Sequence, residues 1–138
     1  MSEGLVKPAE DRLRVSSGSR FEPIIGFSRA VRVGNFVAVG GTTAASGGQP
    51  VAVGDPEAQT RATLAVIAKA LGGAGASLAD VIRTRIYLVD IGHWEAVGRV
   101  HGEFFGAIRP ATSMLQVSAF IDPDWLVEIE AEAIVSGG

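Results

Sequence analysis

The sequence contains no cysteine and has little net charge, and each shortage excludes a class of chemistry. Without cysteine there are no disulfide bonds, no thiol nucleophile and no thiolate metal site. The formal net charge is −3, and no cluster of lysine and arginine or series of aromatic residues offsets it, which argues against nucleic-acid binding. The two histidines, His93 and His101, lie eight positions apart, and with no cysteine they do not form a recognisable metal-binding motif. We therefore expect neither a metal nor a cofactor.

Long hydrophobic runs are also absent. No segment approaches the roughly 18 apolar residues that a membrane-spanning helix requires, so we expect no membrane association. Residues 1–15 contain acidic residues and a proline where a signal peptide would have an apolar segment. These features predict a cytoplasmic protein. The composition, 47% hydrophobic and 20% charged, is typical of a folded globular chain.

The length of 138 residues suits one domain with a substantial core. Residues 1–12 are polar and predict a flexible N-terminal arm, and residues 13–138 predict a single domain. Glycine is abundant at 18 residues, nearly twice the usual share of about 7%. Several glycines are adjacent, as at Gly40-Gly41 and Gly72-Gly73, which indicates tight turns and close approaches of the backbone.

The clearest pattern is in residues 110–133. Apolar and acidic residues alternate in its second half, which predicts a strand with one buried face and a row of three carboxylates on the other. The buried set is Val127, Ile129, Ala131 and Ala133, and the acidic set is Glu128, Glu130 and Glu132. We expect residues 110–133 to form two extended segments joined by a Pro/Asp turn, as a hairpin.

Other elements follow from shorter signals. Residues 13–17 predict a strand and residues 18–26 a loop, while residues 27–33 and 36–41 predict a hairpin around Gly34-Asn35. Residues 42–54 predict a second loop. A helix is expected from Asp55-Pro56 to Gly72-Gly73, then a strand over residues 81–89. A second helix is expected over residues 93–106, with these side chains towards the core: Trp94, Val97, His101, Phe104 and Phe105.

The element order is therefore β-β-β-α-β-α-β-β. It predicts an α+β fold with one mixed six-stranded sheet and two helices on one face. The other face is left uncovered and carries the glutamates, which favours self-association through that face.

Three segments resemble the RidA/YjgF family, whose fold is chorismate-mutase-like. They are QTRATLAVIAKALGGAGASLADVIRTRIYLVDIGHWEAVGRVHGEFFG, RPATSMLQV and LVEIEAEA, and the resemblance runs from about residue 27 to residue 135. It implies a homotrimer that binds a small-molecule ligand in clefts between subunits. It also implies hydrolysis of reactive enamines and imines to a keto acid and ammonia.

The resemblance assigns roles to individual residues. Glu128 matches the glutamate that handles the attacking water, and Gly41 matches a glycine whose backbone approaches the ligand. Several positions depart from the family pattern. Thr112 stands where deaminating members have the arginine that binds the substrate carboxylate, which argues against the standard 2-aminoacrylate activity. The remaining departures are Phe27 for a tyrosine, Gly40 for a serine, Gly98 for an asparagine and Met114 for a cysteine.

Four ionisable residues are candidates for the site, each with an alternative. Glu128 could serve as a catalytic base, or it could join a salt-bridge ladder with arginines of a neighbouring strand. Arg85 and Arg29 are equal contenders for the missing anion-binding charge, although Arg85 also suits an ion pair on the sheet. His101 stands where relatives often have tyrosine, and a lone helical histidine is more often a packing residue than a catalyst.

Two functions remain open at this point. The first is a deaminase-type hydrolase of imines, enamines or related carbonyl compounds, in which Glu128 activates water in an inter-subunit cleft. The second is a non-catalytic trimer that senses a ligand or binds a partner. Ribonuclease activity is also attributed to parts of this family, but the acidic charge balance argues against it.

Overall fold

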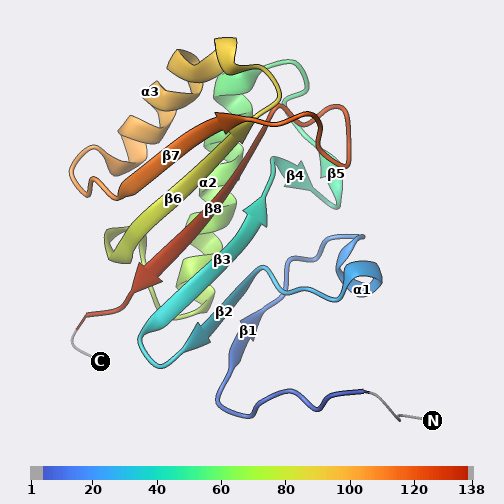
Figure 1. The fold of residues 1–138 in the computed structure, drawn as a ribbon, viewed down its shortest axis with the longest axis vertical. Helices are drawn as coiled ribbons and strands as arrows, with labels where there is room; N and C mark the ends of the chain where they lie inside the picture. The colour runs from blue at the N-terminus through green and yellow to red at the C-terminus, as the bar shows by residue number, and fades with distance from the viewer. Residues whose placement is uncertain (1–4, 137–138) are drawn as a thin grey trace.

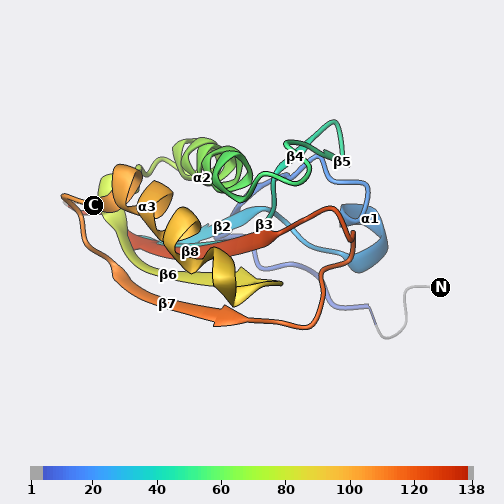
Figure 2. The ribbon, with the colours of Figure 1, turned by 90° about the horizontal axis from the view of Figure 1, so that it is seen from above.

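The computed structural model describes residues 5–136, and a mixed six-stranded sheet forms its centre (Figure 1). Both long helices lie on one side of this curved sheet (Figure 2). The predicted α+β architecture is thus confirmed. Among the strands of residues 5–136, only β6 and β7 pair in parallel. In spatial order the strands are β1 (Leu13–Val15), β2 (Ala30–Val33), β3 (Phe36–Thr42), β8 (Val127–Ile134), β6 (Val81–Leu88) and β7 (Ala111–Gln116).

The register predicted for β8 is confirmed. The four apolar side chains of the alternating set are at most 2% exposed and lie under the helices, while the three glutamates occupy the opposite face. Because β8 lies between β3 and β6, both of its edges are hydrogen-bonded. A one-residue slip would expose the entire apolar set, so the core fixes where the glutamates point.

The predicted hairpin of residues 110–133 is wrong. β7 and β8 do not pair, because β6 lies between them and is hydrogen-bonded to both. β7 follows β6 through α3, and such a crossover places two strands side by side in parallel. Residues 117–126 then carry the chain past β6 to the centre of the sheet. Alternation identified the buried face of β8 but not its neighbours.

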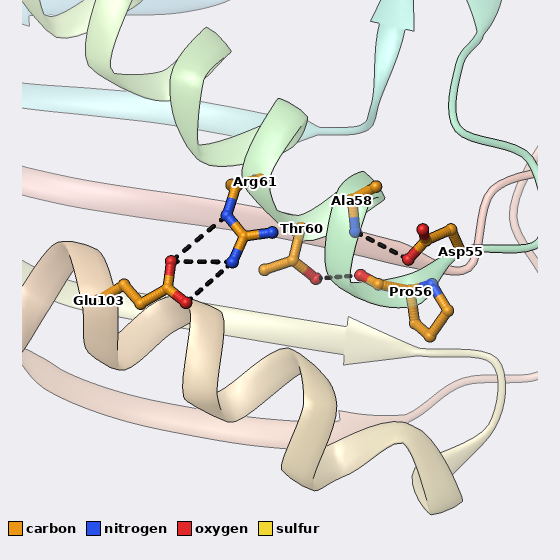
Figure 3. Close-up of polar contacts among 6 residues, drawn as sticks. All are labelled: Asp55, Pro56, Ala58, Thr60, Arg61 and Glu103. Carbon is orange, nitrogen blue, oxygen red and sulfur yellow. Dashed lines mark hydrogen bonds and ion pairs between the residues drawn. The ribbon is translucent and has the colours of Figure 1, made fainter.

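α2 (Pro56–Gly73) begins as predicted: Asp55 Oδ1 accepts a hydrogen bond from Ala58 N at 3.0 Å (Figure 3). α3 (Trp94–Phe105) follows a short 3₁₀ turn, η2 (Ile91–His93). Trp94 is 57% exposed, contrary to the prediction, because it begins the helix at the end of that turn. An exposed Arg61–Glu103 fork, 2.8 Å at its shortest, links the helices and contributes little to stability (Figure 3).

Both predicted loops contain short elements. Residues 18–26 include the helix α1 (Glu22–Ile25), and residues 42–54 include the paired strands β4 (Ala45–Ser46) and β5 (Gln49–Pro50). A further 3₁₀ turn, η1 (Leu78–Asp80), precedes β6. These elements are too short to produce a periodic pattern, so periodicity did not predict them.

Residues 5–12 form no helix or strand, and the first four residues of the predicted N-terminal arm lie outside the described residues. Within residues 5–136, no helix has the length and apolar character needed to cross a membrane.

Gln59 joins α2 to the connection that precedes β8. Its side chain is fully buried, and Nε2 donates to the carbonyls of Asp124 at 2.7 Å and Val51 at 3.3 Å. Its Oε1 accepts from Leu126 N at 2.8 Å. One buried amide therefore satisfies three backbone groups and fixes the path of residues 124–126.

We expect Gln59→Leu to lower the free energy of unfolding by about 2–3 kcal/mol, because buried backbone groups lose their partners. Chemical denaturation would measure this, with Lys69→Ala, an exposed position on the same helix, as the control that changes stability by less than about 0.5 kcal/mol. Equal stability of Gln59→Leu and the control would contradict the role of this amide.

Candidate functional site

A cavity of about 310 Å³ brings together five of the residues predicted for the site: Phe27, Arg29, Gly40, Gly41 and Glu128. Apart from Phe27, its apolar wall consists of Phe21, Ile25, Ile121 and Trp125. Strands β3 and β8 supply the glycines and the glutamate. The residues between β1 and β2, together with the connection before β8, supply most of the rest. The cavity therefore combines the carboxylate of Glu128 and the guanidinium group of Arg29 with an apolar surface.

Glu128 lies directly against the backbone of Gly41. A Cβ atom added at Gly41 would be 2.6 Å from Glu128 Oε2, closer than real Cβ contacts allow. The sequence predicted that another group would closely approach the backbone at Gly41. In the structure that group is the Glu128 side chain. At Gly40 an added Cβ would be no closer than 3.6 Å to any atom, an ordinary contact. Of these two glycines, only Gly41 could not carry a Cβ atom without a movement of the Glu128 side chain.

The Glu128 carboxyl has a raised pKa. Burial is the main cause, and the nearby charge of Glu130 adds to it, while Arg29 acts in the opposite direction. No direct ion pair or hydrogen bond of Glu128 occurs within residues 5–136. A half-buried carboxylate with a raised pKa and no partner is a stronger proton acceptor than an ordinary glutamate, as a general base requires.

The other two glutamates of β8 are occupied. Arg85 Nη1 is 2.8 Å from Glu132 Oε1 and 3.4 Å from Glu130 Oε1. Tyr87 donates a hydrogen bond to Glu130 Oε1 at 2.7 Å. Arg85 therefore belongs to an ion-pair ladder on the uncovered face and does not line the cavity. The salt-bridge ladder that was the predicted alternative role for Glu128 therefore forms with Glu130 and Glu132 and does not include Glu128.

Arg29 is the arginine that lines the cavity. Its Nη1 donates to Gly41 O at 2.5 Å and Thr42 Oγ1 at 3.2 Å, and its Cζ lies 5.6 Å from the centre of the Phe27 ring. Burial lowers the pKa of Arg29, while Glu128 and Glu22 act to raise it. Within the described residues Nη2 makes no hydrogen bond, and Nε is buried without a partner. Of these donors Nη2 remains for an anionic ligand, whereas Nε is enclosed by the protein.

The remaining predicted residues form a second group, around α3, β6 and β7. His101 Nε2 is 2.9 Å from Thr84 Oγ1, which is 2.7 Å from Thr112 Oγ1. Thr112 donates to Pro110 O at 3.0 Å, so Thr84 must donate to Thr112, and His101 Nε2 must carry a hydrogen. Burial lowers the pKa of His101, which favours the neutral ring. Gly98 of α3 faces Met114 of β7, since a Cβ atom added at Gly98 would lie 3.9 Å from Met114 Cε.

The two groups do not meet within one chain. Thr84 and Thr112 point to the face of the sheet that the helices cover, whereas Glu128 points to the uncovered face. The structure therefore unites Glu128 with Arg29, Phe27, Gly40 and Gly41, and separates it from Arg85, Gly98, His101, Thr112 and Met114.

Sequence reasoning missed most of the apolar wall. Phe21, Ile25, Ile121 and Trp125 all lie in segments that were interpreted as loop or turn. Large apolar residues in expected loops were the available signal, since a loop without a function seldom contains several of them. No three acidic or histidine residues within 5–136 are placed to hold a metal ion.

Comparisons with known proteins agree with the fold. The model of the family described as Endoribonuclease L-PSP matches residues 17–135. A crystal structure of Rv2704 from Mycobacterium tuberculosis, a member of the YjgF/YER057c/UK114 family, is 56% identical, with a TM-score of 0.82, covering 90% of this chain and 99% of that one.

Two curated relatives add to this. Protein SCO2049 of Streptomyces coelicolor is 43% identical over 87% of this chain and 90% of its own length. The 3-aminoacrylate deaminase RutC of Acinetobacter baylyi is 37% identical over 82% of this chain and 90% of its own length.

Substituting Gly41→Ala should displace the Glu128 carboxylate, because the new methyl group occupies its position. The free energy of unfolding should change by less than about 1 kcal/mol, since only the end of a flexible side chain has to move. Crystal structures of Gly41→Ala and of the control Gly40→Ala would test this. Unchanged Glu128 positions in both variants would contradict the close packing described above.

Proposed function

Because this chain belongs to the Endoribonuclease L-PSP family, the RidA/YjgF family that its sequence resembles, we propose that it hydrolyses small imines or enamines and that Glu128 activates the attacking water. The observation that carries this proposal is the presence, in one cavity, of an unpaired carboxylate and an arginine whose Nη2 makes no hydrogen bond within residues 5–136. The 3-aminoacrylate deaminase among the relatives supports the reaction class.

Glu128 acts on the water in this proposal. The carboxylate takes a proton from water as the water oxygen bonds to the imine carbon, and the electron pair of the C=N bond moves to nitrogen. Nitrogen takes up a proton from solvent, which gives a tetrahedral aminoalcohol. Glu128 then gives its proton to the amino group, which leaves as ammonia while the hydroxyl loses its proton to solvent and the carbonyl forms. One water is consumed and one keto compound and one ammonia are released. The raised pKa suits both proton transfers.

Arg29 binds the anionic end of the substrate. Thr112 cannot do so, because its hydroxyl hydrogen is used by Pro110 O, and Arg85 is held by two glutamates. Arg29 lines the same cavity as Glu128 and is fixed through Nη1, which leaves Nη2 for a carboxylate oxygen. In this proposal Arg29 is therefore the anion-binding group of the cavity, although position 112 is not an arginine.

The active form in this proposal is a homotrimer that packs through the uncovered face of the sheet. Three exposed apolar residues, Val33, Phe36 and Ile134, are adjacent on that face and 38–48% exposed. Covering such a patch favours association. In this proposal the cavity borders the seam between two subunits, because Glu128 lies on the same uncovered face of the sheet.

Two other functions make different predictions. A ligand-sensing protein would bind a small acid in the cavity without turnover. A ribonuclease, as the family name suggests, would have to bind a polyanion beside three glutamates on a chain of net charge −3, which is electrostatically unfavourable.

Replacing Glu128 by Gln should lower the rate of ammonia release from imines by about 10²–10⁴-fold, the usual contribution of a general base. Arg29→Met should raise KM for anionic imines about 10- to 100-fold with less effect on kcat, because it removes one charged hydrogen bond. Imines made in place by an amino-acid oxidase would serve as substrates.

Glu103→Gln, on the exposed surface of α3, is the control and should retain full activity. Light scattering should give the same particle mass for all the variants. Full activity of Glu128→Gln would refute the assignment, whereas binding of keto acids without turnover of any imine would favour the ligand-sensing alternative.

A further inference from the structure

One wall of the Glu128 cavity is more apolar than a small polar substrate requires. Ile25 of α1 and Ile121 of the connection before β8 are 59% and 66% exposed although both line the cavity. Phe21 and Trp125 complete this surface, which we call the apolar wall. Exposed isoleucines beside a polar site are unfavourable in water, and a ligand with an apolar group would cover them.

The apolar wall is held in position without a ligand. Glu22, the first residue of α1, accepts hydrogen bonds from Ser17 N and Ser17 Oγ, both at 2.7 Å, and from Ser16 Oγ at 2.8 Å. These bonds fix the short helix that carries Ile25. A preformed surface loses little conformational entropy on binding, so its apolar contacts contribute more fully to affinity.

The two segments of the wall are also joined to each other. The rings of Phe21 and Trp125 pack edge to face, with centroids 6.5 Å apart, and Arg20 pairs with Asp122 at 3.2 Å. Trp125 is in turn anchored by its hydrogen bond to Ala44 O at 2.7 Å. Ile25 and Ile121 thus project from segments that are tied together close to both residues.

We propose that this cavity prefers imino acids with a branched aliphatic or aromatic side chain over those with a methyl-sized one. The inference rests on the proposed function of Glu128 and Arg29 and extends it to the substrate class. In this arrangement Arg29 holds the carboxylate, Glu128 faces the imine carbon, and the side chain covers Ile25 and Ile121. The volume of about 310 Å³ is at the lower end for ligand sites, which suits one amino-acid-sized molecule.

A pair of substrates tests the preference. The imines of L-leucine and L-alanine would be made in place by an amino-acid oxidase. Semicarbazide traps the imine that has not been hydrolysed, so a slower formation of semicarbazone measures hydrolysis by the protein. Three additional carbon atoms buried against the apolar wall predict a kcat/KM about 10- to 50-fold higher for the leucine imine. Equal values for the two imines would overturn the inference.

Substitutions in the wall test its cause. Ile25→Ser and Ile121→Ser should each lower kcat/KM for the leucine imine about tenfold and leave that for the alanine imine within about twofold. Ile91→Ser is the matched control, because Ile91 is 44% exposed and does not line the cavity. Equal losses for both imines, or a changed particle mass in light scattering, would show that the isoleucines serve assembly and would refute the proposal.

Binding of reaction products separates this inference from the proposed function. Calorimetry with 4-methyl-2-oxopentanoate and with pyruvate measures the same preference without any chemical step. If no imine is hydrolysed but 4-methyl-2-oxopentanoate binds about tenfold tighter, and Ile25→Ser removes that difference, the inference holds and the hydrolase assignment fails. If imines are hydrolysed and both keto acids bind equally, the hydrolase assignment holds and the inference fails.

Discussion

The site depends on how the acidic face of β8 is neutralised. Alternation along β8 buries its apolar side chains and places Glu128, Glu130 and Glu132 in a row on the other face. Arg85 and Tyr87 satisfy the last two, and nothing in the described chain pairs with the first. The unpaired carboxylate fits because Gly41 has no side chain in its way. The burial of the apolar face of β8 thus fixes the position of the unpaired Glu128 carboxylate in the cavity.

The surroundings of Glu128 make it useful for chemistry rather than for stability. A group whose pKa is raised in the folded chain favours folding while it is protonated, and this contribution is lost as the pH rises through its folded pKa. Ionised Glu128 therefore destabilises the folded chain, and the burial of the apolar face of β8 offsets this effect. Arg29 moderates the cost without pairing with Glu128, because its Nη1 is held by Gly41 O. The two groups remain available to a ligand, and the apolar wall determines what the rest of that ligand can be.

Much of the fold could be predicted from the sequence, and the reasons for the failures are physical. Period-two alternation identified the faces of β8, and Asp55-Pro56 identified the start of α2. Neither signal says which strands are neighbours, so the final hairpin was wrong. Both arginine candidates lie in segments that the sequence predicts as strands, and only the three-dimensional structure shows that Arg85 opposes glutamates while Arg29 lines the cavity. Thr112 was assigned by resemblance to other proteins. Its place on the opposite face from Glu128 follows from pairing with Thr84, which sequence does not reveal.

The central claim is that Glu128 is unpaired, half-buried and therefore reluctant to ionise. Its most direct test is a pH titration of the Glu128 carboxyl carbon by nuclear magnetic resonance, assigned with the Glu128→Gln variant. We predict a pKa above the ordinary value of 4.5, mainly because of burial. A value at or below 4.5 would contradict this account, because it would mean that Glu128 is paired or solvated like an ordinary surface glutamate.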